Sequence, residues 1–155
     1  MGRSFQEQLK EGQAIAGVTA TPGGQTLSNS NVVTSAINMA NMRRARAFLF
    51  TSTLTGAASL NFGLQASATE AGSYADITLT TTAVQITGIT TDNSYNAIEI
   101  RADQMPAGKP WLIAKVTETA TANAVCCMFI VADCASYSPG NQEDSVTWTN
   151  NMVGA

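Results

Sequence analysis

Histidine is absent from this sequence of 155 residues, and only three cysteines are present, at positions 126, 127 and 134. Without histidine the chain has no imidazole general base, no histidine-based catalytic triad and no histidine metal ligand. The cysteines also lack the Cys-x-x-Cys spacing of common zinc sites. From these absences we predict that the protein has no metal site and no cofactor.

The other residue types that carry chemistry form no catalytic pattern. Lys109 and Lys115 lack a Ser-x-x-Lys context, and the glycine pair in TPGGQT lacks the lysine and the helix of a phosphate loop. Four carboxylates near turns have no spacing that singles out a glycosidase pair. They are Asp76, Asp92, Glu99 and Asp103. We therefore predict that the protein is not an enzyme and has no catalytic residues.

Charge is also scarce, because only 12% of the residues are charged and the net charge is -3. This is about half the usual share, so Thr, Ser, Asn, Gln, Ala and Gly must cover much of the surface. Such a surface is typical of a subunit in an assembly, although a secreted binding module can share it. The acidic balance lacks the basic footprint of nucleic-acid binding. We expect protein partners and no direct nucleic-acid contact.

Long hydrophobic runs are missing as well. No stretch reaches the roughly 18 apolar residues that span a membrane, and the N-terminal MGRSFQEQLKEG lacks the apolar region of a secretory signal. The adjacent Cys126 and Cys127 point to opposite faces of a strand, which disfavours a disulfide between them. We expect buried, reduced thiols, no membrane partner and folding in a reducing cytoplasm.

Helical periodicity occurs only in residues 3–12. Ser4 and Glu7 match the spacing of a capping box, Phe5 and Leu9 share one face, and Gly12 is a stop signal. So short a helix is not stable alone, so it either docks on this domain or a neighbour, or frays. Residues 13–30 are small and polar and include Pro-Gly-Gly, which predicts an extended arm.

Alternating apolar and polar residues predict about eight short strands between residues 32 and 132. The central pair is WLIAKVTETATANAVCCMFIVA, residues 111–132, interpreted as a hairpin. Its first strand has one apolar face, whereas residues 125–131 are apolar on both faces. A strand that is apolar on both faces is covered on both, or is hidden by a neighbouring subunit.

These patterns predict an all-β fold, an antiparallel β-sandwich of the jelly-roll or immunoglobulin-like kind. The sandwich is assigned to residues 31–137. It is preceded by an N-terminal arm with a short helix, residues 1–30, and followed by a C-terminal tail, residues 138–155.

Six residues are candidates for a partner interface. Arg43, Arg44 and Arg46 form the only charge cluster, which is either a solvated strand end or a set of salt-bridge donors to a neighbouring subunit. Trp148 needs burial on its own domain or on a partner. Phe5 and Leu9 need the same if their helix forms.

Two segments carry a family resemblance. The phrase Leu64-Gln65-Ala66-Ser67 leads through a turn to Gly72-Ser73-Tyr74-Ala75-Asp76-Ile77, and a later strand ends at Arg101 before an aromatic strand with Trp111 and Lys115. Across residues 48–137 the sequence resembles small virion proteins encoded among the head genes of tailed bacteriophages.

The resemblance implies a structural virion protein of a tailed bacteriophage, in the class of capsid decoration or cement proteins. Its partner would be the major capsid protein of the same virion, and it would be a homo-oligomer, with a trimer favoured. It would lie on the capsid surface after synthesis in the host bacterial cytoplasm. In this hypothesis residues 1–30, with the tail around Trp148, bind across capsomer boundaries.

Two alternatives belong to other functional classes. A carbohydrate- or receptor-binding module would stack Trp111, Tyr95 or Trp148 on sugar rings. A neck or tail protein would form a ring of six or twelve subunits.

Overall fold

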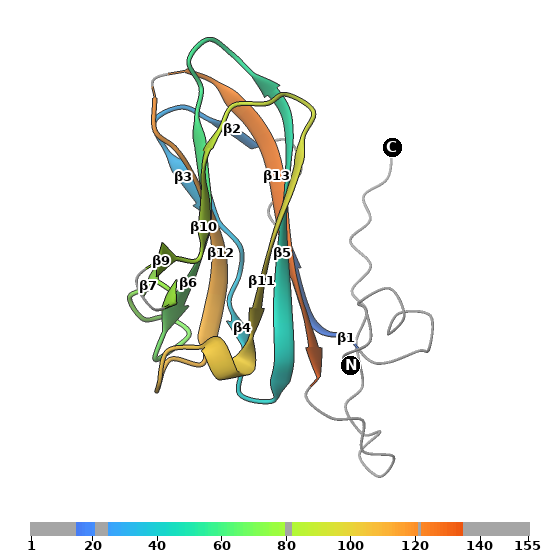
Figure 1. The fold of residues 1–155 in the computed structure, drawn as a ribbon, viewed down its shortest axis with the longest axis vertical. Helices are drawn as coiled ribbons and strands as arrows, with labels where there is room; N and C mark the ends of the chain where they lie inside the picture. Colours follow the sequence, from blue (N-terminus) through green and yellow to red (C-terminus); the bar gives the residue numbers. More distant parts are fainter. Residues whose placement is uncertain (1–14, 21–24, 80–81, 121, 135–155) are drawn as a thin grey trace.

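The computed structural model describes residues 15–20, 25–79, 82–120 and 122–134, with residues 15–20, 25, 82 and 134 described through their backbone alone (Figure 1). Two antiparallel sheets face each other. Sheet A has the order β1 (Ile15–Ala20), β13 (Ala124–Cys134), β5 (Met42–Leu54) and β11 (Tyr95–Arg101), and β2 (Gln25–Leu27) also pairs with β13. This architecture confirms the predicted all-β sandwich.

Sheet B packs against sheet A. Its order is β10 (Gln85–Ile89), β6 (Leu60–Ser67), β12 (Trp111–Glu118) and β3 (Asn31–Val33). Two short strands extend it, since β4 (Ile37–Asn38) pairs with β12 and β7 (Ala75–Asp76) pairs with β6. A separate ribbon joins β8 (Thr78–Leu79) to β9 (Thr82–Ala83), and the 3-10 turn η1 (Ala102–Gln104) follows β11.

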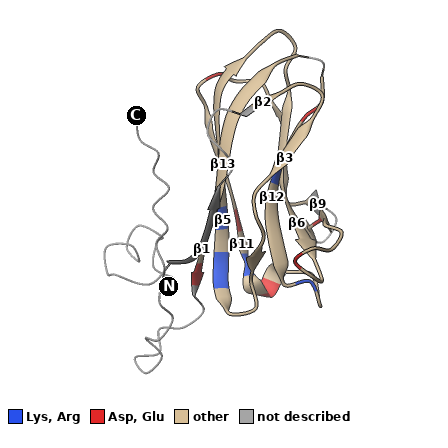
Figure 2. Cartoon of the chain, turned by 180° about the vertical axis from the view of Figure 1, so that it is seen from behind, with Lys and Arg blue, Asp and Glu red and all other residues tan. Residues whose placement is uncertain are grey.

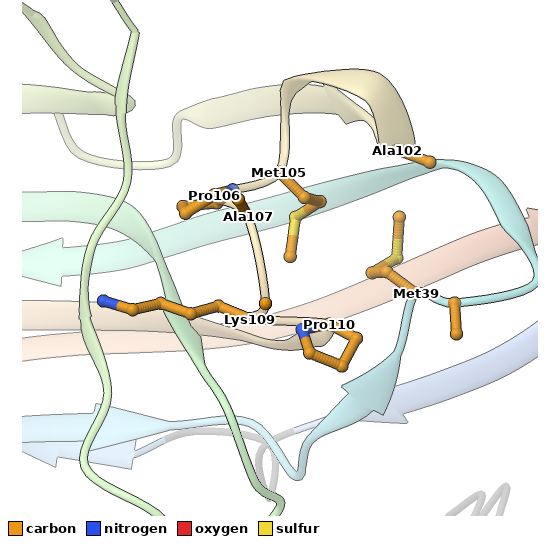
Figure 3. Close-up of a pocket in the computed structure, with 9 residues that line it drawn as sticks. Met39, Ala102, Met105, Pro106, Ala107, Lys109 and Pro110 are labelled. Atoms are coloured by element: carbon orange, nitrogen blue, oxygen red, sulfur yellow. The ribbon is translucent and has the colours of Figure 1, made fainter.

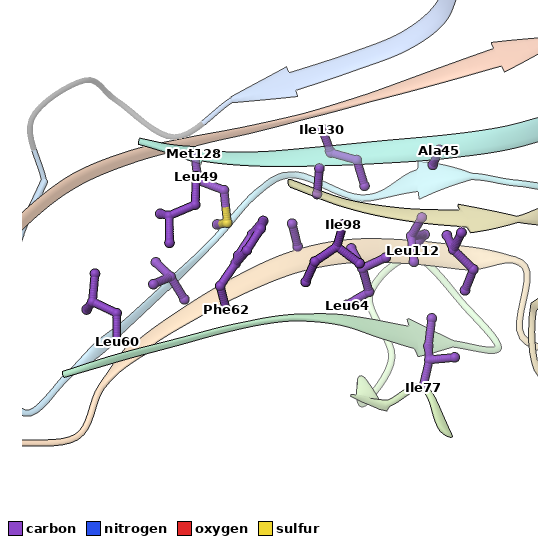
Figure 4. Close-up of a cluster of buried hydrophobic side chains, with 14 of the residues drawn as sticks. Ala45, Leu49, Leu60, Phe62, Leu64, Ile77, Ile98, Leu112, Met128 and Ile130 are labelled. Atoms are coloured by element: carbon purple, nitrogen blue, oxygen red, sulfur yellow. The ribbon is translucent and has the colours of Figure 1, made fainter. Parts of the chain in front are cut away.

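The core forms between the sheets because successive residues of each strand point to opposite faces. One face of every long strand is apolar and almost completely buried, and these faces meet in the middle of the sandwich (Figure 4). The fully buried members with the largest side chains include Leu49, Leu60, Phe62, Leu64, Ile100, Leu112, Val116, Met128 and Ile130. Alternation therefore fixes which residues enter the core.

The predicted hairpin of residues 111–132 is wrong. Strand β12 pairs with β6 from Trp111 opposite Ser67 to Glu118 opposite Leu60, whereas β13 pairs with β5. The two strands lie in different sheets, so the chain passes from one sheet to the other between Glu118 and Ala124. A hairpin would place both apolar faces on one side of one sheet, whereas the crossing turns them towards each other across the core. Alternation alone does not separate these two arrangements.

Part of the predicted N-terminal arm belongs to sheet A. Strand β1 runs along β13 from Ile15 opposite Asp133 to Ala20 opposite Phe129, and β2 continues along the same strand. The predicted helix at residues 3–12 and the predicted tail at residues 138–155 lie outside the described residues. The predicted start of the sandwich at residue 31 therefore comes after two strands, β1 and β2, that already belong to sheet A.

Replacement of Phe62 by alanine tests the core. The Phe62 side chain is fully buried between the sheets, so its removal should lower the free energy of unfolding by about 3–5 kcal/mol. Chemical denaturation measures this change. The matched control is Val33→Ala, because Val33 is 44% exposed on β3 and should change stability by about 0.5 kcal/mol or less. Equal effects of the two substitutions would contradict this assignment of the core.

Candidate functional site

Four aromatic side chains gather on the outer face of sheet A, and we call them the aromatic patch: Phe48, Phe50, Tyr95 and Phe129. They meet because of strand register. Phe48 lies opposite Phe129 on β13, and Phe50 lies opposite Tyr95 on β11. Since the neighbouring Ala47 and Leu49 point into the core, the two β5 phenylalanines point outwards. The patch therefore spans the three adjacent strands β13, β5 and β11.

The patch is exposed to an unusual degree for aromatic residues on a sheet. Tyr95 is 57% exposed and Phe50 is 38% exposed, while Phe48 is 9% exposed beneath its neighbours. Among the described strands, sheet B covers only the inner face of sheet A (Figure 1). Contiguous exposed apolar surface of this kind typically marks a binding site, and aromatic residues are enriched at the centres of protein interfaces.

The rings of the patch stack on one another. The Phe48 and Phe129 ring centroids are 4.7 Å apart at 25°, and those of Phe50 and Phe129 are 5.8 Å apart at 14°. The Tyr95 ring lies 5.4 Å from Phe50. These distances are too short for near-parallel rings lying side by side in one plane, so the ring faces turn towards each other. Because side chains stand roughly perpendicular to a sheet, the ring edges point outwards.

Charged residues border the patch at the end where β5 begins (Figure 2). Arg44 Nε lies 2.9 Å from Asp133 Oδ2, and the Arg44 backbone N–H donates to Asp133 Oδ1. Glu99 lies 3.9 Å from Arg44 and 3.4 Å from Arg46. The border is therefore composed of paired charges of both signs, which differs from a basic stripe.

Arg46 joins this border to the patch. Its guanidinium carbon lies 5.8 Å from the centroid of the Phe48 ring, which allows a cation-π contact. Its buried Nε atom has no hydrogen bond within the described part of the chain, because the 3.4 Å contact with Glu99 lacks hydrogen-bond geometry. Arg46 thus lies between Glu99 and the Phe48 ring, with 38% of its side chain exposed.

The predicted interface residues divide into three groups. Arg44 and Arg46 lie together beside the aromatic patch. Arg43 is exposed at the end of β5, on the side of the strand that carries the core residues. Phe5, Leu9 and Trp148 lie outside the described residues.

The sequence analysis missed the patch as a unit. Alternation places Phe48 and Phe50 on the same side as Arg44 and Arg46, and the doubly apolar β13 was a further signal. Tyr95 and Phe129 come from distant segments, and only the register of β11 and β13 against β5 brings them to the same place. That register is not visible in the pattern of a single strand.

Each of the four carboxylates considered for catalysis has a separate structural contact. Asp76 accepts a hydrogen bond from Gln65, and Asp92 accepts one from the Leu54 backbone N–H. Asp103 pairs with Arg101, and Glu99 pairs with the arginines of β5. These contacts account for the four side chains without a shared site.

Glu118 is a buried carboxylate at the point where the chain crosses between the sheets. Its Oε2 accepts the Asn29 N–H at 2.7 Å, and its Oε1 accepts the Ala120 N–H at 2.8 Å and the Ser59 N–H at 3.4 Å. Burial by itself raises the pKa of Glu118, but the three backbone donors outweigh it and the pKa is lowered from 4.5. One side chain thus joins three loops.

The described cysteines do not form a reactive pair. Cys126 points into the core and Cys127 points to the outer face, and both are free thiols. Burial, with a smaller contribution from Cys127, raises the pKa of the Cys126 thiol to about 11. It is therefore protonated at neutral pH and is poorly suited to nucleophilic attack.

The described residues have neither a metal-binding cluster nor a membrane-spanning helix. They contain no group of three or more cysteine, aspartate or glutamate side chains arranged to hold a metal ion. In the same residues there is no helix long and apolar enough to cross a membrane.

Comparisons with known proteins do not assign this chain to a family. No protein-family model matches the chain, and no curated protein matches it. Among solved structures, the chain is similar to one from a study of Bacillus endospore appendages, described as a novel family of disulfide-linked pili. The identity is 19% and the TM-score is 0.43, and the match covers 79% of this chain and 91% of that chain. At these values the similarity carries no inference about function.

Replacement of Glu118 by glutamine tests the role of the carboxylate. Glutamine keeps one acceptor oxygen but presents an amide group to a backbone donor, so the thermal midpoint should fall at pH 7. Because the folded pKa of Glu118 is lowered, its stabilising effect is complete above about 4.5 and is lost as pH falls through the folded value. Thermal unfolding between pH 7 and pH 3 should show the wild type and the variant converging in acid.

The matched control is Glu70→Gln, because Glu70 is exposed. Its thermal midpoint should equal that of the wild type at every pH. A constant difference between wild type and Glu118→Gln across this range would contradict the ionised-acceptor role.

Proposed function

We propose that the protein is a structural virion protein of a tailed bacteriophage, a capsid decoration protein that binds the shell through the aromatic patch. The observation that carries this proposal is that β13 is apolar on both faces while the described strands cover only its inner face. The sequence resemblance to phage head proteins supplies the particular class of partner, the major capsid protein of the same virion.

The chemistry of the patch favours a protein partner. Large aromatic side chains at the centre of an interface typically contribute most of its binding energy. The border holds two arginines and two carboxylates in ion pairs, so their charges balance. These charged residues are Arg44, Arg46, Glu99 and Asp133.

Arg46 indicates what the partner surface contains. The Arg46 side chain is 38% exposed although its Nε atom is buried, so an acceptor on a partner can reach the exposed part of this cationic side chain. The complementary surface of the partner protein would therefore be an apolar area flanked by a carboxylate or a backbone carbonyl. Such a pairing also fixes the orientation of the bound protein.

Ring orientation separates this proposal from the carbohydrate-binding alternative. Sugar rings stack on exposed aromatic faces, whereas the faces in the patch are turned towards neighbouring rings. A protein surface packs against ring edges without requiring a free face. The geometry of the patch thus supports a protein interface more than a sugar platform.

The C-terminal residues that follow β13 fit an extended contact on the capsid surface. Ile15 lies opposite Asp133, so residues 1–14 and residues 135–155 both begin at one end of sheet A. The tail with Trp148 starts at the charged border of the patch and is proposed to extend the contact to a neighbouring capsid subunit. Copies around a local three-fold axis would then form the favoured trimer.

The test is binding to shells assembled from the major capsid protein of the same genome. The double variant Phe50→Ser/Tyr95→Ser should lose at least about tenfold in affinity, since truncated aromatic anchors commonly cost 2 kcal/mol or more. Co-sedimentation over a range of protein concentrations measures the change. Folding should be intact, because both side chains are partly exposed, and chemical denaturation checks this.

The matched control is Val33→Ser, which removes an exposed apolar side chain from sheet B. It should bind shells as the wild type does. Full occupancy by the double variant would contradict the role of the patch, and failure of the wild type to bind at any ratio would contradict the decoration function. A native assembly of six or twelve subunits would favour the neck or tail alternative.

A further inference from the structure

An apolar groove of about 410 Å³ lies at the end of the sandwich where β4 leads into β5 (Figure 3). One wall is formed by Met39 and Ala40, and the other by Ala102 and residues 105–110. The side chains of Met39 and Met105 extend towards each other across the groove. The groove is separate from the aromatic patch, which lies on the outer face of sheet A.

The walls have a fixed backbone and adaptable side chains. Met39 N–H donates to Pro110 O at 2.7 Å, which ties the two walls together, and Lys109 N–H donates to Pro106 O at 3.0 Å. Met105 is half-buried, unbranched and polarisable, so it can adjust to apolar groups of different shape, whereas Met39 is 2% exposed and belongs to the core. Such a groove suits one or two large apolar side chains.

The chain segment before β1 begins close to this groove. Ile15 lies opposite Asp133, Asp133 lies opposite Arg44, and β5 starts at Met42, directly after the turn that follows Met39. Figure 1 accordingly shows the start of β1 and η1 at the same end of the sandwich. Fourteen residues reach roughly 45 Å when extended, which is far more than the roughly 10 Å between two packed sheets.

The sequence of that segment matches the chemistry of the groove. Residues 1–14 carry two large apolar side chains with helical spacing, Phe5 and Leu9, and these need a surface because a ten-residue helix is not stable alone. Lys109 is the one charged residue that lines the groove, so the lining is mainly apolar. The apolar pair Phe5 and Leu9 therefore matches it.

We infer that the groove is the docking site of the N-terminal segment of the same chain, residues 1–14, with Phe5 and Leu9 packed on Met105, Pro106 and Pro110. The same chain is the favoured source because a short tether gives a high effective concentration. The inference goes beyond the proposed function and does not depend on it, since the groove and the aromatic patch are different surfaces.

Photo-cross-linking of the full-length protein tests this inference. Phe5 is replaced by p-benzoylphenylalanine, whose excited ketone inserts into nearby C–H bonds, and mass spectrometry locates the product. The expected product is a cross-link to Met105 or its neighbours in the groove. The control places the same group at Glu7, on the opposite helix face from Phe5 and Leu9, and should give much less of this product.

A mixture of isotope-labelled and unlabelled protein separates the two sources of the segment. Products within one isotopic species support docking in the same chain. Mixed-label products in the groove would overturn it in favour of a second copy, and cross-links to the aromatic patch or nowhere would overturn it altogether.

Hydrogen exchange provides a second measurement that needs no photochemistry. The full-length variant Phe5→Ser/Leu9→Ser should lose amide protection in residues 105–110, because the groove opens to water. The control Gln6→Ser/Gln8→Ser should retain this protection. Unchanged protection in the first variant would contradict the docking.

Discussion

A strand that is apolar on both faces needs cover on both faces, and β13 imposes this constraint on the whole structure. Its inner face packs into the core through Met128, Ile130 and Ala132. Its outer face contributes Phe129 to the aromatic patch, with Phe48 and Phe50 supplied by the neighbouring β5. Since sheet B occupies the inner side and no other described strand covers the outer side, we propose that a partner covers it. The proposed interface follows from this asymmetry and needs no catalytic group.

The crossing between the two sheets determines how that asymmetry arises. If β12 and β13 formed a hairpin, the apolar faces of both would lie on one side of a single sheet. The chain instead crosses the core after Glu118, whose carboxylate accepts hydrogen bonds from three loops. A buried carboxylate with three backbone donors stays ionised and holds those loops together. Sheet A can then present its second apolar face outwards.

The alternation of apolar and polar residues predicted where strands occur, but it did not predict which strands pair. The segment predicted to hold two strands, residues 111–132, does contain β12 and most of β13. Pairing was wrong for residues 111–132, because alternation encodes faces and carries no information on neighbours. The pairing of β1 and β2 was missed because short segments rich in small residues carry a weak pattern. The alternation within β5 predicts that Phe48 and Phe50 share a face. Placing Tyr95 and Phe129 beside them requires the register of β11 and β13 against β5.

The central claim is that the outer face of sheet A is covered by protein in the native assembly. Hydroxyl-radical footprinting of Phe50 and Tyr95, in the free protein and in the native particle, tests it most directly, with Val33 on sheet B as the internal reference. The account predicts strong protection of both aromatic residues in the particle while Val33 stays as reactive as in the free protein. Equal reactivity of Tyr95 in the two states would contradict it.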